Sequence, residues 1–254
     1  MIEFERQKEI LTRFLPRPPA RVLDIGGGPG AYSLWLAHQG YEVHLLDVMG
    51  LHIEEAKRRA QAQRVAIDAT VGDARALPYP DRFADALLLM GPLYHLTDPA
   101  GRKAALLEAR RVLRPGGLLA TVGISRFTSM LDGSWQGFIR DPKFRPIVSR
   151  DLRSGQHRNP PGHPSYFTTA YFHHPEELRS EIKGAGFRDV HVVASEGFLW
   201  WTPGILELWK DTHLREYLKG LLRRVEEEPS LIGLGPHLMG LARRPRRRAL
   251  PSAP

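Results

Sequence analysis

Three glycines and one carboxylate carry the clearest chemical signal in the sequence. Gly26, Gly28 and Gly30 lie in a short run directly after the apolar segment 21–25. A glycine-rich turn between a strand and a helix brings the backbone close to a ligand, because no side chain occupies the space. Asp47 follows about 20 residues later, where a carboxylate can accept hydrogen bonds from both hydroxyls of a ribose. Loop and acid together predict a site for a nucleoside.

The glycine loop alone leaves two cofactor classes open. Residues 26–31 read Gly-Gly-Gly-Pro-Gly-Ala. They satisfy the G-x-G-x-x-A pattern of dinucleotide sites and also a G-x-G-x-G pattern, so the motif does not separate NAD from S-adenosylmethionine.

An alternation of short apolar strands and amphipathic helices must position these residues. Strands are expected at 21–25, 41–46, 69–71, 83–90, 118–124, 188–194 and 237–242. Helices are expected at 1–15, 31–39, 53–64, 99–113, 175–185 and 204–228, and a turn at 114–117. Strands separated by helices of this length predict an α/β fold with a mostly parallel sheet, right-handed crossovers and helices on both faces.

Residues 125–170 interrupt this rhythm and are too long for an ordinary connection. They are rich in Gly, Pro, Arg, His and aromatic residues, so we expect an inserted, partly helical cap over the active site. Its aromatic side chains could shape an apolar pocket, and an arginine could recognise an anionic group. The substrate-binding candidates are Arg126, Trp135, Tyr166 and Phe167. The four histidines at 157, 163, 173 and 174 match no standard metal-ligand spacing, so no metal is expected.

The composition limits the class of protein. The chain has 254 residues and no cysteine, which removes disulfides and thiolate chemistry. No apolar run approaches the roughly 20 residues of a membrane span, and the N-terminus lacks a signal-peptide layout, so a cytoplasmic enzyme is expected. We expect one domain over 1–242 and a basic, disordered tail over 243–254. Five arginines of that tail account for most of the net charge of +8: without them, 31 basic residues face 28 acidic ones. Such a tail could bind an RNA backbone.

Five segments in order resemble the class I S-adenosylmethionine-dependent methyltransferases, over nearly all of residues 20–242. Val22 to Gly30 resembles the first motif of that family, and Asp47 resembles its ribose-binding acid. The other three segments are Val71-Gly72-Asp73-Ala74 with Leu77-Pro78, which resembles the part beside the adenine, Arg111 to Gly117 before the fifth strand, and Glu176 to Phe187 with its Ala-Gly-Phe entry to a strand.

The resemblance implies a fold, a cofactor and a set of residues. It implies a Rossmann-like seven-stranded sheet in the order 3-2-1-4-5-7-6, with the last strand antiparallel, and S-adenosylmethionine as cofactor. The implied cofactor-binding residues are Asp24, Gly26, Gly28, Gly30, Asp47, Val48, Met49, Asp73, Ala74 and Met90. The sulfonium would lie near the end of the fourth strand, where His95 is the first candidate for a base or acceptor-orienting group, with Tyr94 beside it.

Four functions stay open at this point. The near-neutral body and long aromatic cap favour methyl transfer to a small molecule. The arginine tail leaves RNA or protein as an alternative acceptor. An NAD-dependent oxidoreductase shares the glycine loop, but the chain has no Tyr-x-x-x-Lys pair near the end of the fifth strand. A non-catalytic cofactor-binding module would not need the elaborate cap. Oligomeric state has no signature in the sequence.

Overall fold

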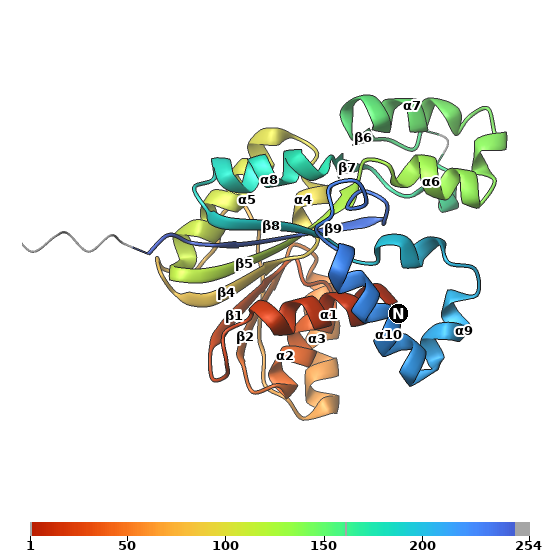
Figure 1. Cartoon of the computed structure of the whole chain (residues 1–254). Helices are drawn as coiled ribbons and strands as arrows, with labels where there is room; N and C mark the ends of the chain where they lie inside the picture. Colours follow the sequence, from red (N-terminus) through yellow and green to blue (C-terminus); the bar gives the residue numbers. More distant parts are fainter. Residues whose placement is uncertain (1, 161, 247–254) are drawn as a thin grey trace, which may run out of the picture.

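The computed structural model describes residues 2–160 and 162–246. Its centre is a twisted sheet whose strands fan out between two layers of helices (Figure 1). Five strands are parallel and run in the order β3-β2-β1-β4-β5. They are β1 (Arg21–Ile25), β2 (Glu42–Asp47), β3 (Asp68–Val71), β4 (Ala84–Leu89) and β5 (Leu113–Ser125).

Two C-terminal strands complete the main sheet. β9 (His237–Arg243) pairs antiparallel with β5 on one side and with β8 (Arg188–Ala194) on the other. When the cap strands β6 and β7 are left out, β8 is the sixth strand of the sheet and β9 the seventh. The order is then 3-2-1-4-5-7-6 with the seventh strand antiparallel, which confirms the expected fold. β1, β4 and most of β5 are buried nearly throughout because helices cover both faces.

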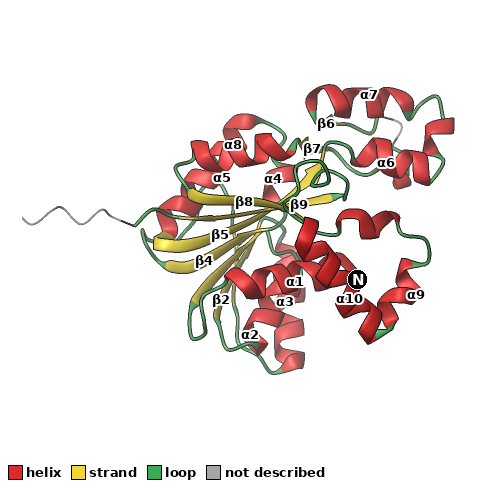
Figure 2. Cartoon of the chain, in the orientation of Figure 1, coloured by secondary structure: helices red, strands yellow, loops and turns green. Residues whose placement is uncertain are grey.

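Alternate side chains of the strands point into two separate cores. On one face, Leu23 and Leu87 pack with α5 (Pro99–Val112) and α8 (Pro175–Gly184). On the other face, Val22 and Leu88 pack with α1 (Ile2–Phe14) and α2 (Ala31–His38), and Leu45 packs with α3 (Gly50–Gln63). Figure 2 shows these two helical layers on either side of the strands.

Residues after β5 form the expected cap region. It contains α6 (Thr128–Trp135), η1 (Phe138–Arg140), α7 (Arg145–Ser154), β6 (Gln156–His157), η2 (Pro164–Tyr166) and β7 (Ala170–His173). β6 and β7, which the sequence did not reveal, pair antiparallel with each other. β7 also adds parallel to the end of β5, where Ile124 pairs with both Phe172 and His237. The cap is therefore anchored at the carboxyl end of β5.

Three of the element boundaries expected from the sequence differ from those in the structure. The helix expected over 204–228 is two, α9 (Ile205–Lys210) and α10 (Thr212–Val225), because Asp211 caps α10 by accepting from His213 N and Leu214 N. They follow η3 (Gly197–Trp201). The turn expected at 114–117 lies inside β5, where a register shift between pairs Ala84–Leu113 and Ala86–Leu118 absorbs the extra residues.

The short helix α4 (Pro92–His95) follows β4.

The third correction concerns the expected start of the tail at residue 243. Arg243 belongs to β9 and donates to Phe14 O. Arg244 donates to the carbonyls of Arg111 and Leu113, so both arginines are part of the domain. The remainder of the expected tail, 247–254, lies outside the described residues. Among the residues that are described, no helix has both the length and the hydrophobicity to cross a membrane.

Candidate functional site

The glycine loop leaves β1 in a left-handed backbone conformation. Gly26 and Gly28 have φ of 68° and 56°, values that other residues adopt only at a cost. A Cβ on Gly26 would lie 2.5 Å from Cγ of Pro92, whereas one on Gly28 would meet nothing within 4 Å. The loop is thus packed against α4 on one side and open on the other. Gly30 begins α2 as its N-cap.

Asp47 ties the end of β2 to this loop. Its Oδ2 accepts from Gly28 N at 2.9 Å, and its Oδ1 accepts from Met49 N at 2.9 Å. His52 Nδ1, in the first turn of α3, lies 3.1 Å from the same Oδ1. These contacts hold the carboxylate at the mouth of the loop.

A cavity of about 620 Å³ opens at the carboxyl ends of β1, β2, β3 and β4. This edge of an open α/β sheet is where ligands bind. Nine of the predicted residues line it: Gly26, Gly28, Asp47, Val48, Met49, Asp73, Ala74, Tyr94 and His95. Asp24, Gly30 and Met90 do not line it. The structure therefore brings most of the predicted cofactor set together with both catalytic candidates.

Asp24 lies fully buried on β1 behind the glycine loop. Its Oδ2 accepts from Ser33 Oγ at 2.7 Å, while its Oδ1 has no hydrogen-bond partner among the described residues. Burial raises the pKa of Asp24 to about 6, although the bond from Ser33 opposes this. A buried carboxyl with an unpartnered oxygen is costly and is a common mark of a ligand site.

The opposite wall of the cavity is partly apolar and partly charged. Val48 and Met49 are 61% and 53% exposed, so two large apolar side chains flank the cavity uncovered. Asp73 forms a bidentate pair with Arg75, with Nη2 2.6 Å from Oδ2, and the arginine lowers the pKa of Asp73. Ala74 is buried beside them.

Tyr94 and His95 lie on α4, with ring centroids 4.6 Å apart. Burial lowers the pKa of His95, against the attraction of Asp47, so its imidazole is neutral at pH 7. Burial also raises the pKa of Tyr94 to about 12, which keeps its hydroxyl protonated. The neutral imidazole can accept a proton and the phenol can donate a hydrogen bond.

A second cavity, of about 320 Å³, lies between the cap and the ends of β5 and β9. Two of the substrate-binding candidates, Tyr166 and Phe167, line it together with Phe138, Phe172 and Trp200. The two cavities adjoin at Tyr94, which lines the first and packs on Ile124 and Phe172 of the second.

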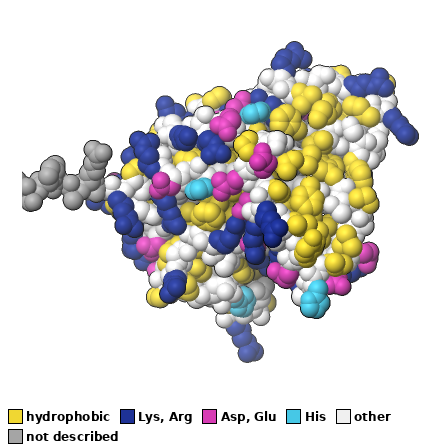
Figure 3. Space-filling model, in the orientation of Figure 1, with side chains coloured by type: hydrophobic (Ala, Val, Ile, Leu, Met, Phe, Trp, Pro, Cys, Tyr) yellow, Lys and Arg dark blue, Asp and Glu magenta, His cyan; other side chains and the backbone are white. Residues whose placement is uncertain are grey.

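The other two substrate candidates lie elsewhere. Arg126 forms an ion pair with Glu177 and contacts the hydroxyl of Tyr171, so it fastens the cap to α8 and does not line either cavity. Trp135 is 56% exposed and packs edge-on against Trp201. Figure 3 shows hydrophobic side chains gathered over the cap and the α9 segment, and the exposed ones there include Met130, Trp135, Trp200 and Leu206.

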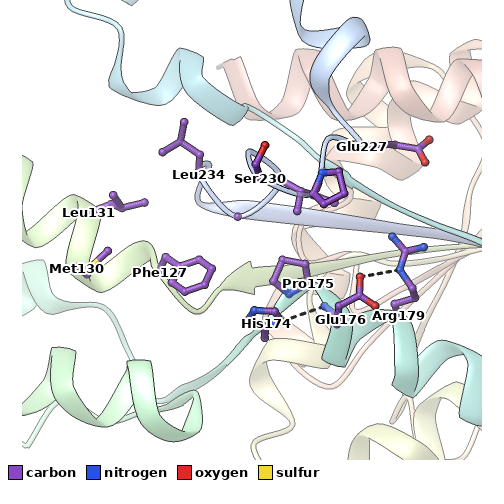
Figure 4. Close-up of a pocket in the computed structure, with 13 residues that line it drawn as sticks. Phe127, Met130, Leu131, His174, Pro175, Glu176, Arg179, Glu227, Ser230 and Leu234 are labelled. Atoms are coloured by element: carbon purple, nitrogen blue, oxygen red, sulfur yellow. Dashed lines mark hydrogen bonds and ion pairs between the residues drawn. The ribbon is translucent and has the colours of Figure 1, made fainter.

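A third hollow, of about 420 Å³, lies beside α6 and the start of α8 (Figure 4). Its wall is largely apolar, with Phe127, Met130 and Leu131 on the cap side. Its polar groups serve α8 itself: His174 Nδ1 accepts from Glu176 N, and Arg179 pairs with Glu176. No set of free reactive groups converges there among the described residues.

The histidines at 157, 163, 173 and 174 do not gather around one point. His157 bonds Asp151 and the carbonyl of Tyr166, and His173 contacts Glu181. Another trio does gather within the described part of the chain: the ligand atoms of Glu3, Glu196 and His237 all lie within 4.8 Å of one another. The sequence analysis missed this trio because its members are far apart along the chain.

Several other residues of the large cavity were not among the predicted site residues, although Gly72 belongs to the segment expected beside the adenine: Leu46, His52, Gly72, Arg75, Gly91, Pro92 and Leu96. Most are direct neighbours of predicted residues at strand ends, and that proximity was the available signal. His52 is different, since it reaches the cavity from the first turn of the helix after Asp47. An i+5 spacing from a strand-end acid is too common to have singled it out.

Comparisons with known proteins agree with this geometry. Residues 22–117 match the family described as "Methyltransferase domain". A ubiquinone/menaquinone biosynthesis C-methyltransferase, UbiE, from Ruegeria sp. (strain TM1040) is 36% identical over 115 residues, or 44% of this chain and 45% of that protein. The UbiE protein of Acidiphilium cryptum (strain JF-5) is 34% identical over 158 residues, or 59% of this chain and 62% of the relative. The chain thus spans between two fifths and two thirds of the length of these curated relatives.

The crystal structure of a SAM-dependent methyltransferase from Methanosarcina mazei shares the fold. The TM-score is 0.63 at 21% identity, and the match covers 94% of this chain and 98% of that one. Fold, motif order and family match decide between the two cofactor classes that the glycine loop left open. The family match over residues 22–117 and the fold of nearly the whole chain together support a class I S-adenosylmethionine-dependent methyltransferase.

Proposed function

We propose that this protein transfers a methyl group from S-adenosylmethionine to a small-molecule acceptor held under the cap. The observation that carries the proposal is the junction of two cavities. A cavity of about 620 Å³ around the glycine loop and Asp47 adjoins an aromatic cavity of about 320 Å³ at Tyr94. One suits a nucleoside cofactor and the other suits a compact, largely apolar acceptor.

The residues present fit the cofactor. The open side of Gly28 leaves room that a Cβ would fill, and Oδ1 of Asp24 is a buried acceptor to which no residue in the described part of the chain donates. We assign the methionine part of the cofactor to Gly26 and Gly28, with Asp24 beneath them, and the ribose to Asp47. The adenine is assigned to Val48, Met49, Asp73 and Ala74, while Gly30 and Met90 support the site from behind.

When bound, S-adenosylmethionine supplies a methyl group on a sulfonium that departs as a neutral thioether. The protein's task is to align the acceptor atom with that methyl at about 3–3.5 Å and to exclude water. His95 can take a proton from the acceptor because its imidazole is neutral at pH 7. Tyr94, at the junction, can orient the acceptor through its hydroxyl.

The relatives' names support a small organic acceptor, since both are called C-methyltransferases of ubiquinone/menaquinone biosynthesis. Aromatic walls and modest volume favour a compound with a planar ring. RNA is a weaker candidate. β9 runs from His237 beside the aromatic cavity to Arg243, which pairs with Leu118 of β5. Arg243 therefore lies at the opposite end of β9 from that cavity. A chain without cysteine suits action in the cytoplasm.

Calorimetric titration with S-adenosylhomocysteine, and with NAD in parallel, tests the cofactor. We expect micromolar binding of the first, about −8 kcal/mol, and none of the second. Release of S-adenosylhomocysteine is then followed with a panel of hydroxylated aromatic compounds and with total RNA. Binding of NAD alone would overturn the proposal, and turnover with RNA alone would replace the acceptor class.

A further inference from the structure

A histidine and two carboxylates meet at one corner of the aromatic cavity. His237, the first residue of β9, has its Nδ1 2.7 Å from Glu196 Oε1 and 3.8 Å from Glu3 Oε1. Glu196 follows β8 and is fully buried, and its Oε2 has no hydrogen-bond partner among the described residues. A buried carboxylate is tolerated when a cation pairs with it, so Glu196 favours the protonated imidazole.

His237 also lines the aromatic cavity. Since Nδ1 is engaged with Glu196, Nε2 is the ring nitrogen left for a ligand, and no hydrogen bond from it to a described residue is found. Burial lowers the pKa of His237, but Glu196 and then Glu3 outweigh burial and raise the pKa to about 9. A ring that is protonated at pH 7 carries a hydrogen on Nε2 as well as on Nδ1, so His237 can offer a donor to the cavity that it lines.

The remaining walls offer little competition for this donor. Phe138, Phe144 and Phe172 contribute rings, and both nitrogens of His157 are already engaged with Asp151 and Tyr166 O. Two other titratable groups among the described residues line the cavity: Tyr166, whose hydroxyl donates to Asp141, and Asp132 on α6, whose pKa is raised by burial.

Building on the proposed function, we infer that His237 binds the methyl acceptor: its Nε2–H donates to an oxygen carried by a planar aromatic acceptor, and Glu196 keeps the ring protonated and oriented. His237 is then a specificity-determining residue, and Glu196 acts through it as a positioning residue. The acceptor class that results is a hydroxylated aromatic compound. Its ring contacts the phenyl walls, and its oxygen is directed to the corner where β9 begins.

Binding of two matched probes tests this inference. 2-Naphthol and naphthalene share a ring system and differ by one oxygen. Affinities are measured by fluorescence titration of the full chain at pH 7 in the presence of saturating S-adenosylhomocysteine. We expect 2-naphthol to bind about tenfold more tightly than naphthalene, because a donor to its oxygen is available only in that complex.

Three variants separate the hydrogen bond from the packing. His237→Phe keeps a ring without a donor and should bring the ratio of the two affinities to about one. His237→Gln supplies an amide donor and should restore part of the preference. Glu196→Gln should weaken it by loosening the ring and easing its deprotonation. Each variant is required to bind S-adenosylhomocysteine as the wild type does, which controls for folding.

The pH dependence gives an independent readout. 2-Methoxynaphthalene accepts a hydrogen bond but does not titrate, so its binding should weaken as the pH rises through about 9, where His237 loses its proton. His237→Gln should bind it equally from pH 7 to 10. A preference for 2-naphthol that survives in His237→Phe overturns the inference, as does failure of both probes to bind.

The same experiment distinguishes failure of this inference from failure of the proposed function. If S-adenosylhomocysteine does not bind, the proposed function falls. If it binds and the probes behave identically in wild type and variants, only the role of His237 falls. Loss of 2-naphthol binding in EDTA would overturn the direct hydrogen bond in favour of a metal held by Glu3, Glu196 and His237.

Discussion

Asp24→Asn should stabilise the protein in the absence of cofactor. Asp24 is fully buried, and burial raises its pKa from 3.8 to about 6. Each pKa unit corresponds to about 1.4 kcal/mol, so keeping this carboxyl ionised in the folded state at pH 7 costs up to about 3 kcal/mol. Asparagine has nearly the same shape and no charge. It can still accept from Ser33, and it exchanges one unpartnered polar atom for another.

The sign of the effect gives the prediction a pH signature. Between pH 3.8 and about 6 the folded protein holds a proton at Asp24 that the unfolded chain has lost. Wild-type stability therefore falls as the pH rises through this window, and the deficit stays constant above it. The difference between Asp24→Asn and wild type should be near zero below pH 4, grow up to pH 6 and level off. At about 2–4 °C per kcal/mol for a chain of this size, the shift in Tm at pH 7 is about 6–12 °C.

Urea denaturation from pH 4 to pH 8 measures this difference directly. Asp81→Asn is the matched control, because Asp81 forms an exposed ion pair with Arg111 and loses the same charge. Its substitution should change stability by at most about 1 kcal/mol. Equal stability of Asp24→Asn and wild type at pH 7, or a gain that does not depend on pH, would refute the argument from burial. Weaker binding of S-adenosylhomocysteine by Asp24→Asn is expected with the gain, as at other strained ligand sites.

Three further changes are informative. Asp47→Asn should weaken S-adenosylhomocysteine binding by about 10–100-fold in calorimetry, because a charged acceptor is lost; unchanged affinity would remove Asp47 from the ribose site. Burial lowers the pKa of His95, so kcat should rise with pH to a plateau that is reached at a lower pH than for an ordinary histidine. His95→Asn should slow S-adenosylhomocysteine formation by about 10²-fold or more and abolish this rise with pH. A wild-type profile in the variant would leave His95 a structural role. Gly133→Ala would put a Cβ 2.2 Å from Cε1 of Phe144 and should cost about 1–3 kcal/mol, seen as faster hydrogen exchange in α6 and α7, whereas Gly184→Ala has open space and should not destabilise.

The parts of the fold that could be predicted from the sequence are those fixed by nearby residues. β1, the glycine loop and α2 follow one another within the segment 21–38, and their apolar spacing and glycines carry the signal locally. The same holds for Asp47, which ends a short apolar strand. The parallel order then brings the carboxyl ends of β1, β2, β3 and β4 together. A residue's place at the end of its strand therefore predicted most of the residues that line the large cavity.

Boundaries failed where tertiary pairing overrode a local signal. Residues 114–117 have the proline and glycines of a turn, yet the backbone on both sides pairs with β4, and the turn survives as a bulge inside β5. Residues 243 and 244 are part of an arginine-rich run that suggested a disordered tail. Pairing of β9 with β5 and β8 continues through Arg243, which no compositional rule detects.

The aromatic cavity was the hardest part to predict because no local pattern defines it. Arg126 attracted attention as a cation in an aromatic cap, but Glu177 neutralises it from fifty-one positions away. His237 was not a candidate, since a histidine at the start of a strand is ordinary in the sequence and only the fold brings Glu196 to it. In both cases the chemistry of the residue is set by a partner that is distant in sequence. The type of a residue in the cap predicts which interactions its side chain can make. Only the fold determines whether the side chain makes them with other residues of the protein or is available to a ligand.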